Sequence, residues 1–307
     1  MSMRGTVRYG ISNRYTVESE GKLIECTLKG KQLSTDTDEY SALAPGDLVE
    51  FEVASELHGL GVVHQRLPRN GTFGRWNKKR NRVQVFAANI DQVVCVCSAA
   101  APPFHPRFVD RVLVTADWYK LPAIVIMNKR DLGVADESFA YLSWLSQLGY
   151  RVKRCSASSG NGMRSIAKML TGHRSVLVGQ SGVGKSTILN SVVPELDLKV
   201  GEISKKYDRG VHTTRFGQLI DLPHGGWVVD VPGIREIELV PGAGNELDSH
   251  FWDIAALAGE CRLPRCSHLH EPDCAVIEAA ESGALPFQRY ESYGMLRREV
   301  SDSPAPN

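Results

Sequence analysis

The sequence predicts an α/β core that follows a small all-β region and precedes a helical one. Short strands broken by turn signals occupy residues 1 to about 70. From about 80 to 240, continuous apolar runs alternate with segments of helical periodicity, which is typical of a mainly parallel sheet. After Gly242 the chain becomes polar and helical and carries a cysteine/histidine cluster. We therefore expect three domains, at 1–72, 73–242 and 243–307.

Length and composition narrow the class of protein. The 307 residues are 42% hydrophobic and 23% charged, as in ordinary globular proteins, and suffice for two or three domains. No apolar run approaches the roughly 18 residues that span a bilayer, and the N-terminus lacks the apolar segment of a secretory signal. Seven unevenly spaced cysteines argue against a disulfide scaffold. These features predict a cytoplasmic protein without membrane contact, which we expect to be a monomer.

The first region reads as a small barrel. Its candidate strands are "GTVRY", "RYTVE", "KLIECTLK", "DLVEFEV" and "GVVHQRL". Leu48, Phe51 and Val53 alternate with Glu50 and Glu52, as expected for half-buried antiparallel strands. About five such strands in about 65 residues favour a closed barrel. An OB-fold, which often binds nucleic acid, and an SH3-like barrel both fit this pattern.

A basic run separates the barrel from the core. Between His64 and Ile90 there are seven basic residues and no acidic one, although the net charge of the chain is only +1. Such an excess could neutralise nucleic-acid phosphates, or it could be a solvated linker. The basic residues are Arg66, Arg69, Arg75, Lys78, Lys79, Arg80 and Arg82.

Strand and helix alternate in the core. The runs "QVVCVCSA" (92–99) and "PAIVIM" (122–127) are apolar throughout, as in strands covered on both faces. Segments 105–120 and 138–150 carry apolar residues at helical spacing. The alternation predicts that functional loops follow the carboxyl ends of the strands.

A phosphate-binding loop occupies "GQSGVGKST", which matches G-x-x-x-x-G-K-[ST]. Small residues allow consecutive backbone N–H groups to turn toward phosphates, and the following helix adds its positive end. Lys185 is expected to reach the β- and γ-phosphates and Ser186 to ligate Mg²⁺. The strand "RSVLV" before the loop and the helix "KSTILNSVV" after it supply the required context. The loop residues are Gly179, Gln180, Ser181, Gly182, Val183, Gly184, Lys185, Ser186 and Thr187.

A guanine-recognition motif precedes this loop in the chain. Asn128, Lys129 and Asp131 follow a buried strand in "NKRD". A carboxylate at Asp131 accepts hydrogen bonds from guanine N1–H and the exocyclic amine, whereas adenine would leave it unpaired. Ser156 and the Ala157 N–H, in "CSAS", are expected to face the guanine oxygen. The combination with the phosphate loop favours GTP and GDP over ATP.

Two further motifs complete a magnesium and γ-phosphate site. Asp230 ends a strand in "DVPG" and is expected to hold Mg²⁺ through water, while the Gly233 N–H senses the γ-phosphate. Between this motif and the phosphate loop lies "RGVHTTR", where Thr213 or Thr214 could close over the ion. Ser186 belongs to the same expected ligand set.

The usual water-positioning glutamine is missing. The residue after Gly233 is Ile234, which cannot orient water, so intrinsic hydrolysis is expected to be slow. His212 is the nearest polar candidate in the chain, although a lone loop histidine is more often without a catalytic role.

The order of these motifs is a cyclic rearrangement of the usual GTPase order. The chain has, in this order, the guanine-recognition motif, the Ser-Ala pair, the phosphate loop, the threonine loop and the D-x-x-G motif. It therefore resembles the circularly permuted GTPases. The segments "RLPRNG", "AANIDQVVCV", "DRVLV" and "GVHTT", with the later cysteine/histidine cluster, are similar to the bacterial ribosome small subunit-dependent GTPase A family. The resemblance extends from about residue 4 to 299.

This resemblance implies an N-terminal OB-fold, a permuted GTPase core and a C-terminal zinc domain. It also implies binding to the 30S subunit and its 16S rRNA late in maturation, with GTP hydrolysis stimulated by that subunit. By the same resemblance, His212 takes part in hydrolysis.

The C-terminal cluster has the composition of a structural zinc site. Cys261, Cys266, His268 and Cys274 give C-x₄-C-x-H-x₅-C, and three thiolates with one imidazole leave no position for water. His270 is a rival nitrogen ligand by spacing, and the family pattern favours His268. A small region with few large apolar residues is expected to depend on this metal to fold.

Two other functions stay open on the residues alone. A non-catalytic RNA-binding switch would use GTP only to set its conformation. A phosphate-loop kinase or ATPase would share the loop, but Asp131 argues against adenine.

Overall fold

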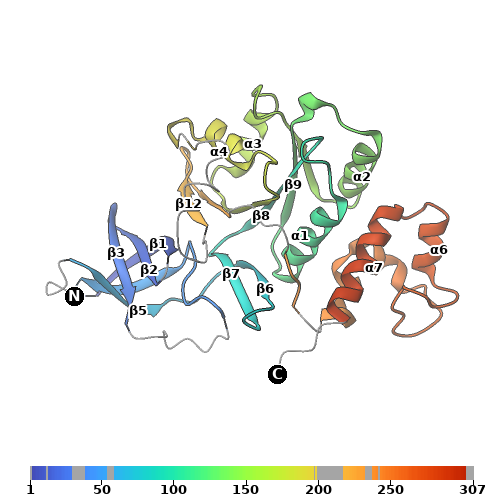
Figure 1. Ribbon diagram of the computed structural model, residues 1–307, viewed down its shortest axis with the longest axis horizontal. Helices are drawn as coiled ribbons and strands as arrows, with labels where there is room; N and C mark the ends of the chain where they lie inside the picture. The colour runs from blue at the N-terminus through green and yellow to red at the C-terminus, as the bar shows by residue number, and fades with distance from the viewer. Residues whose placement is uncertain are drawn as a thin grey trace.

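The computed structural model describes residues 2–11, 13–29, 39–53, 59–196, 198, 217–231, 237–240 and 243–301. In Figure 1 a barrel, a central α/β unit and a C-terminal helical region follow one another. The α/β unit lies between the other two.

The N-terminal strands form a closed barrel of order β1-β2-β3-β5-β4, in which β1 also pairs with β4. The parallel pairing of β3 with β5 requires a crossover, which is the Greek-key arrangement of an OB-fold and decides against the SH3-like alternative. Alternate residues such as Val17, Phe51 and Val63 are fully buried and fill the interior. The strands are β1 (Met3–Ile11), β2 (Arg14–Ser19), β3 (Lys22–Leu28), β4 (Leu48–Val53) and β5 (Gly61–Arg66).

A β-hairpin that the sequence did not reveal follows the barrel. Strands β6 (Thr72–Asn77) and β7 (Arg82–Ala88) pair antiparallel, with Asn81 at positive φ in the turn. The hairpin packs on the core through Phe73, Phe86 and Ala87, which belong to the same buried cluster as the central sheet.

The basic run splits into two parts with different surroundings. Arg66 and Arg69 have side chains only 7% exposed, and both pair with Glu39. Arg69 also binds Asp47 with two hydrogen bonds of 2.7 Å. These two arginines stabilise the exit of the barrel, so the expectation that they contact nucleic acid is corrected. The hairpin tip carries the exposed basic residues Lys78, Lys79, Arg80 and Arg82.

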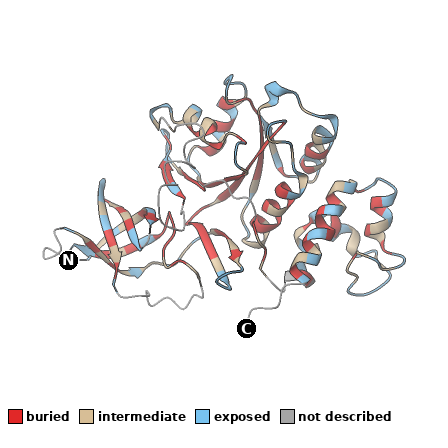
Figure 2. Cartoon of the chain, viewed as in Figure 1, coloured by how far each residue is buried: buried red, intermediate tan, exposed pale blue. Residues whose placement is uncertain are grey.

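The central sheet has the order β10-β9-β8-β11-β13-β12, with β12 antiparallel to its neighbour and the other pairs parallel. Strand β8 is buried along its whole length, and β9 and β11 are buried from their second residue on, as their apolar runs predict; Figure 2 shows buried residues along them. The strands are β8 (Gln92–Ser98), β9 (Ala123–Asn128), β10 (Arg151–Arg154), β11 (Arg174–Gly179), β12 (Gln218–Asp221) and β13 (Trp227–Asp230).

Helices cover both faces of this sheet. One face packs against α1 (Pro106–Trp118) and α2 (Asp136–Gln147), and the other against α3 (Met163–Leu170) and α4 (Lys185–Val192). From β8 the chain continues to β9 and β10 on one side of the sheet, and from β11 it continues to β12 and β13 on the other. The order in which strands are added therefore reverses between β8 and β11. In open α/β sheets ligands bind outside the carboxyl ends of the strands at such a point. Short 3₁₀ turns lie at Arg130–Leu132 and Pro194–Leu196.

The C-terminal region has its own apolar cluster, which includes Phe251, Ile254, Tyr293 and Leu296. It packs on the core because α7 lies against α1, on the side of α1 away from the sheet (Figure 1). In the part of the chain that the structure describes, no helix has the length and apolar character to cross a membrane. The elements are 3₁₀ turns at Ala243–Glu246 and Asp248–His250, then α5 (Trp252–Ala258), α6 (Ala275–Glu281) and α7 (Phe287–Ser301).

Candidate nucleotide and metal sites

The predicted phosphate loop connects the carboxyl end of β11 to the first turn of α4. Gly184 caps α4 with φ of 94°, a conformation that favours glycine. A Cβ at Gly184 would lie 2.3 Å from Asn128 Nδ2, and one at Gly179 would lie 2.5 Å from the backbone oxygen of Val96. Both glycines are therefore required by close approach. Ser186 and Thr187 lie in the first turn of α4.

Lys185 is folded into this loop. Its side chain is buried, and Nζ donates to the backbone oxygens of Gly179 at 2.8 Å and Gln180 at 3.3 Å. Burial lowers the pKa of Lys185, an effect that the charge of Asp230 opposes. An ammonium held by carbonyl oxygens alone can exchange those partners for phosphate oxygens, which offer full charge.

Asp230 lies at the end of β13, in register with Leu177 of β11, beside the phosphate loop. It is buried, and its Oδ1 atom has no hydrogen-bond partner among the described residues. Burial raises the pKa of Asp230 to about 6, although Lys185 lowers it. A buried carboxylate oxygen without a donor suits a cation or its bound water, so Asp230 fits the magnesium role predicted for it.

Asn128 joins the base-recognition motif to the phosphate loop. It ends β9, is almost fully buried, and its Nδ2 donates to Val183 O at 3.0 Å. Its Oδ1 accepts from Ala157 N–H at 3.0 Å and from Cys155 Sγ at 3.5 Å. One amide therefore links three loops that are far apart in sequence.

The other base-recognition residues lie beside Asn128, and their burial differs from one to the next. Asp131 is exposed, and a hydrogen bond from Ser156 is the main reason that its pKa lies below the usual value. Lys129 has φ of 61°, and its Nζ donates to the backbone oxygen of Ala101. Ser156 is buried and its hydroxyl is 3.0 Å from that of Ser158. The structure thus brings together the residues predicted from "NKRD" and "CSAS".

Some predicted residues lie outside the described ranges. His212, Thr213, Thr214 and Gly233 belong to this group, so their roles stay predictions.

The loop between β8 and α1 also borders this site, and no motif marked it. Pro102 lies near the phosphate loop, because its Cδ is 3.7 Å from the place that a Cβ on Gly182 would take. Ala101 accepts from Lys129, as described above. The loop follows β8, the strand between those that carry "NKRD" and the phosphate loop. Strand order, which the sequence did not supply, would have identified it.

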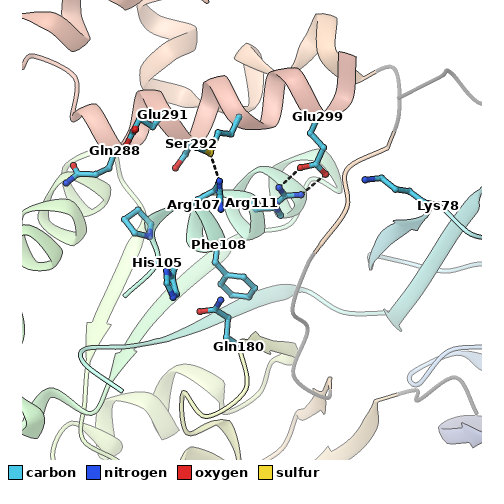
Figure 3. A pocket seen from close by; sticks show the side chains of 12 residues that line it. Lys78, His105, Arg107, Phe108, Arg111, Gln180, Gln288, Glu291, Ser292 and Glu299 are labelled. Carbon is cyan, nitrogen blue, oxygen red and sulfur yellow. Dashed lines mark hydrogen bonds and ion pairs between the residues drawn. The ribbon is translucent and has the colours of Figure 1, made fainter. Parts of the chain in front are cut away.

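A cavity of about 680 Å³ lies between the phosphate loop and α7. Figure 3 shows Gln180 on one side of it and Glu291 and Ser292 of α7 on the other. Arg111 of α1 forms an ion pair with Glu299 in its wall.

The C-terminal cysteines and His268 form a compact cluster. The ligand atoms of Cys261, Cys266, His268 and Cys274 all lie within 4.8 Å of one another. His268 Nδ1 is 3.4 Å from both Cys261 Sγ and Cys274 Sγ, and these sulfurs are 3.8 Å apart. Such separations match the edges of a tetrahedron with metal–sulfur bonds of about 2.3 Å. These four residues could therefore hold a metal ion.

His268, and not His270, faces this cluster. His268 is buried, whereas His270 is exposed. The second ring nitrogen of His268 lies 4.0 Å from Asp248 Oδ2. At this distance the two atoms form no hydrogen bond, and this nitrogen has no hydrogen-bond partner among the described residues.

Comparisons with known proteins agree with this architecture. The profile of the RsgA GTPase family matches residues 66–240. A small ribosomal subunit biogenesis GTPase RsgA from Moorella thermoacetica is 37% identical over 97% of each chain. The crystal structure of YjeQ from Thermotoga maritima is 30% identical, covers 99% of this chain and 100% of its own, and superposes with a TM-score of 0.71. YloQ, a circularly permuted GTPase, is 27% identical, with 99% and 97% coverage and a TM-score of 0.67.

Proposed function

The chain belongs to the RsgA GTPase family, and from this premise we propose that it hydrolyses GTP in the biogenesis of the small ribosomal subunit. The observation that carries the proposal is the Asn128–Val183 hydrogen bond, which joins the guanine-recognition motif to the phosphate loop in spite of the permuted order. A pocket assembled in this way binds base and phosphates of the same nucleotide.

Each residue of the pocket has a distinct task in this proposal. Asp131 selects guanine, and Lys185 neutralises the β- and γ-phosphates. Ser186, Thr213 or Thr214, and Asp230 would hold Mg²⁺, and the ion would supply charge stabilisation to the phosphates. The imidazole of His212 orients the attacking water, because Ile234 cannot.

The partner proposed for this GTPase is the 30S subunit with its 16S rRNA. The OB-fold and the exposed basic tip of the β6–β7 hairpin support nucleic-acid contact. The cysteine/histidine cluster supports a structural zinc ion, because thiolates and imidazole are the ligands that zinc prefers. We place the protein in the cytoplasm as a monomer.

The direct test compares GTP turnover with and without 30S subunits. We expect stimulation by the subunit, loss of turnover in Lys185→Ala under both conditions, and loss of stimulation in His212→Ala. Lys168→Ala, which changes an exposed lysine of α3, is the matched control and should behave as the unchanged protein. Absence of stimulation, or full stimulation of His212→Ala, would contradict the mechanism. Subunit binding that is equal in the GDP and GTP states, without turnover, would favour a non-catalytic switch.

Base selection has a separate test. Asp131→Asn should shift preference from GTP to xanthosine triphosphate, because the amide donates where the carboxylate accepted. Competition binding with both nucleotides measures the shift. An unchanged preference would mean that Asp131 does not read the base.

A further inference from the structure

The loop between β8 and α1 touches both halves of the nucleotide pocket. Ala99 N–H donates to Asn128 O at 3.0 Å, and Ala101 O accepts from Lys129 Nζ. On its other side the loop borders the phosphate loop, since Pro102 Cδ lies 3.7 Å from the place that a Cβ on Gly182 would take. The position of this loop therefore affects the base-recognition motif and the phosphate loop together.

Helix α1 holds the end of this loop. It begins at Pro106, directly after His105, so the first turn of α1 fixes where the loop ends. Asp110 lies in the second turn and is fully buried, although it carries a carboxylate. A charged group at such a place requires strong partners.

Those partners come from the C-terminal region and from α2. Arg289 of α7, also fully buried, donates from Nη1 to Asp110 Oδ1 at 2.5 Å. Tyr141 of α2 donates its hydroxyl to the same carboxylate at 2.5 Å. On its other edge Arg289 binds Asp253 of α5 through Nε and Nη2, at 3.0 to 3.3 Å. Arg289 thus fixes α1 to two helices of the C-terminal region.

The cavity described above separates α7 from the phosphate loop, so α1 is the element that connects α7 to the nucleotide end of the sheet. Gln180 of the phosphate loop lies across this cavity from Glu291 and Ser292 of α7 (Figure 3). Helix α7 packs directly on α1, and α1 leads directly into the loop at the pocket.

We propose that Asp110 and Arg289 are positioning residues for the guanine-nucleotide pocket. Neither residue contacts the nucleotide. Together they fix the position of α1 on the core, and the position of α1 fixes the loop that holds Lys129 and borders Gly182. Docking of the C-terminal region therefore maintains nucleotide affinity. This inference rests on the proposed function, since it concerns the same pocket.

The test uses Asp110→Asn in the full chain. This change keeps the shape of the side chain and the Arg289–Asp253 pair, and it removes the charge that draws α1 toward α7. We expect the KM for GTP, measured with saturating 30S subunits, to rise roughly fivefold or more with kcat unchanged. The dissociation rate of fluorescently labelled GDP, measured without subunits, should rise by a similar factor.

Two further variants keep the test decisive. Arg289→Lys retains the charge but not the fork of donors, and should raise KM in the same direction if Asp110→Asn fails to fold. Tyr293→Phe is the matched control on α7, because the hydroxyl that it removes donates to Ser267 O inside the C-terminal region. It should leave KM and GDP dissociation unchanged.

The outcomes distinguish the positioning role of Asp110 and Arg289 from the proposed GTPase function. A lower kcat with unchanged KM in Asp110→Asn would indicate only a smaller folded fraction and would overturn the positioning role. An equal rise of KM in Tyr293→Phe would also overturn it, because any disturbance of the C-terminal region would then suffice. If the unchanged chain bound neither GTP nor GDP, the proposed function itself would fail.

Discussion

The barrel and the C-terminal region are attached to the same GTPase core by unlike contacts. Arg8 of the barrel forms a bidentate ion pair with Asp221 of β12, whose side chain is 62% exposed. Arg289 of the C-terminal region pairs with Asp110, and both side chains are fully buried. The same pair of residue types thus has one partner, Asp221, open to water at one end of the core, and both partners in the interior at the other.

The difference in burial decides how firmly each region is held. Exposed ion pairs contribute about 0–1 kcal/mol, because water screens them and long side chains lose freedom. Removing one partner of a buried pair costs about 3–5 kcal/mol, since a charge is left without compensation. We infer that the Arg289–Asp110 pair holds the C-terminal region on the core more strongly than the Arg8–Asp221 pair holds the barrel.

Aromatic contacts reinforce the C-terminal attachment. Trp252 stacks on Tyr150 with centroids 4.3 Å apart and planes within 5°. Asp117 of α1 accepts from Trp252 Nε1 at 3.0 Å and lies 2.7 Å from His250 Nδ1. Such packing adds to the buried ion pair and extends the interface along α1.

Among the changes that test how the two regions are held, metal removal is expected to have the largest effect on stability. Cys266→Ser, or treatment with a strong chelator, should unfold the C-terminal region, because structural zinc contributes on the order of 10 kcal/mol in small domains. Metal content and thermal unfolding measure this. His270→Ala is the control and should retain one metal per chain. Loss of metal in that control would show that His268 had been wrongly chosen.

Arg289→Met should have the next largest effect. It leaves Asp110 and Asp253 buried without their cation, so the free energy of unfolding should fall by about 3–5 kcal/mol. Chemical denaturation measures the change, with the exposed Arg298→Met on the same helix as control. A loss below about 1 kcal/mol would remove the distinction drawn between the two interfaces.

Arg8→Met should have the smallest effect. The Asp221 side chain of this pair is 62% exposed, although that of Arg8 is only 15% exposed, so water screens the pair and we expect a loss of about 0–1 kcal/mol in the free energy of unfolding. Denaturation monitored alongside the Arg289 variant gives the comparison directly. A loss as large as that of Arg289→Met would mean that the barrel is held as firmly as the C-terminal region.

Local pattern predicted the elements that depend on nearby residues. Apolar periodicity predicted the positions of the barrel strands and of α1, α2, α4, β8, β9, β11 and β13, and these elements occur there. The prediction succeeds because the spacing of apolar side chains indicates whether an element buries one face or two. The domain boundaries at 72 and 242 and the roles of individual site residues stay predictions. The β6–β7 hairpin was missed because its basic residues obscured a short alternation of apolar ones.

The charged residues show the limit of this approach. Arg66 and Arg69 looked like part of a nucleic-acid contact, and the fold buries them against Glu39 and Asp47. Asp110 and Arg289 are 179 positions apart, and neither carries a local signal of its partner.

The sequence by itself determined the motifs that carry the proposed chemistry: a phosphate loop, a guanine-recognition motif, their permuted order and a cysteine/histidine set that could hold a metal ion. Each of these depends on residue type at short spacing. Only the tertiary structure decided the strand order of the barrel, the loop between β8 and α1 as a wall of the pocket, and which charges are buried together. Those features depend on contacts between distant segments, and burial, which sets the strength of a charge pair, exists only after the chain has folded.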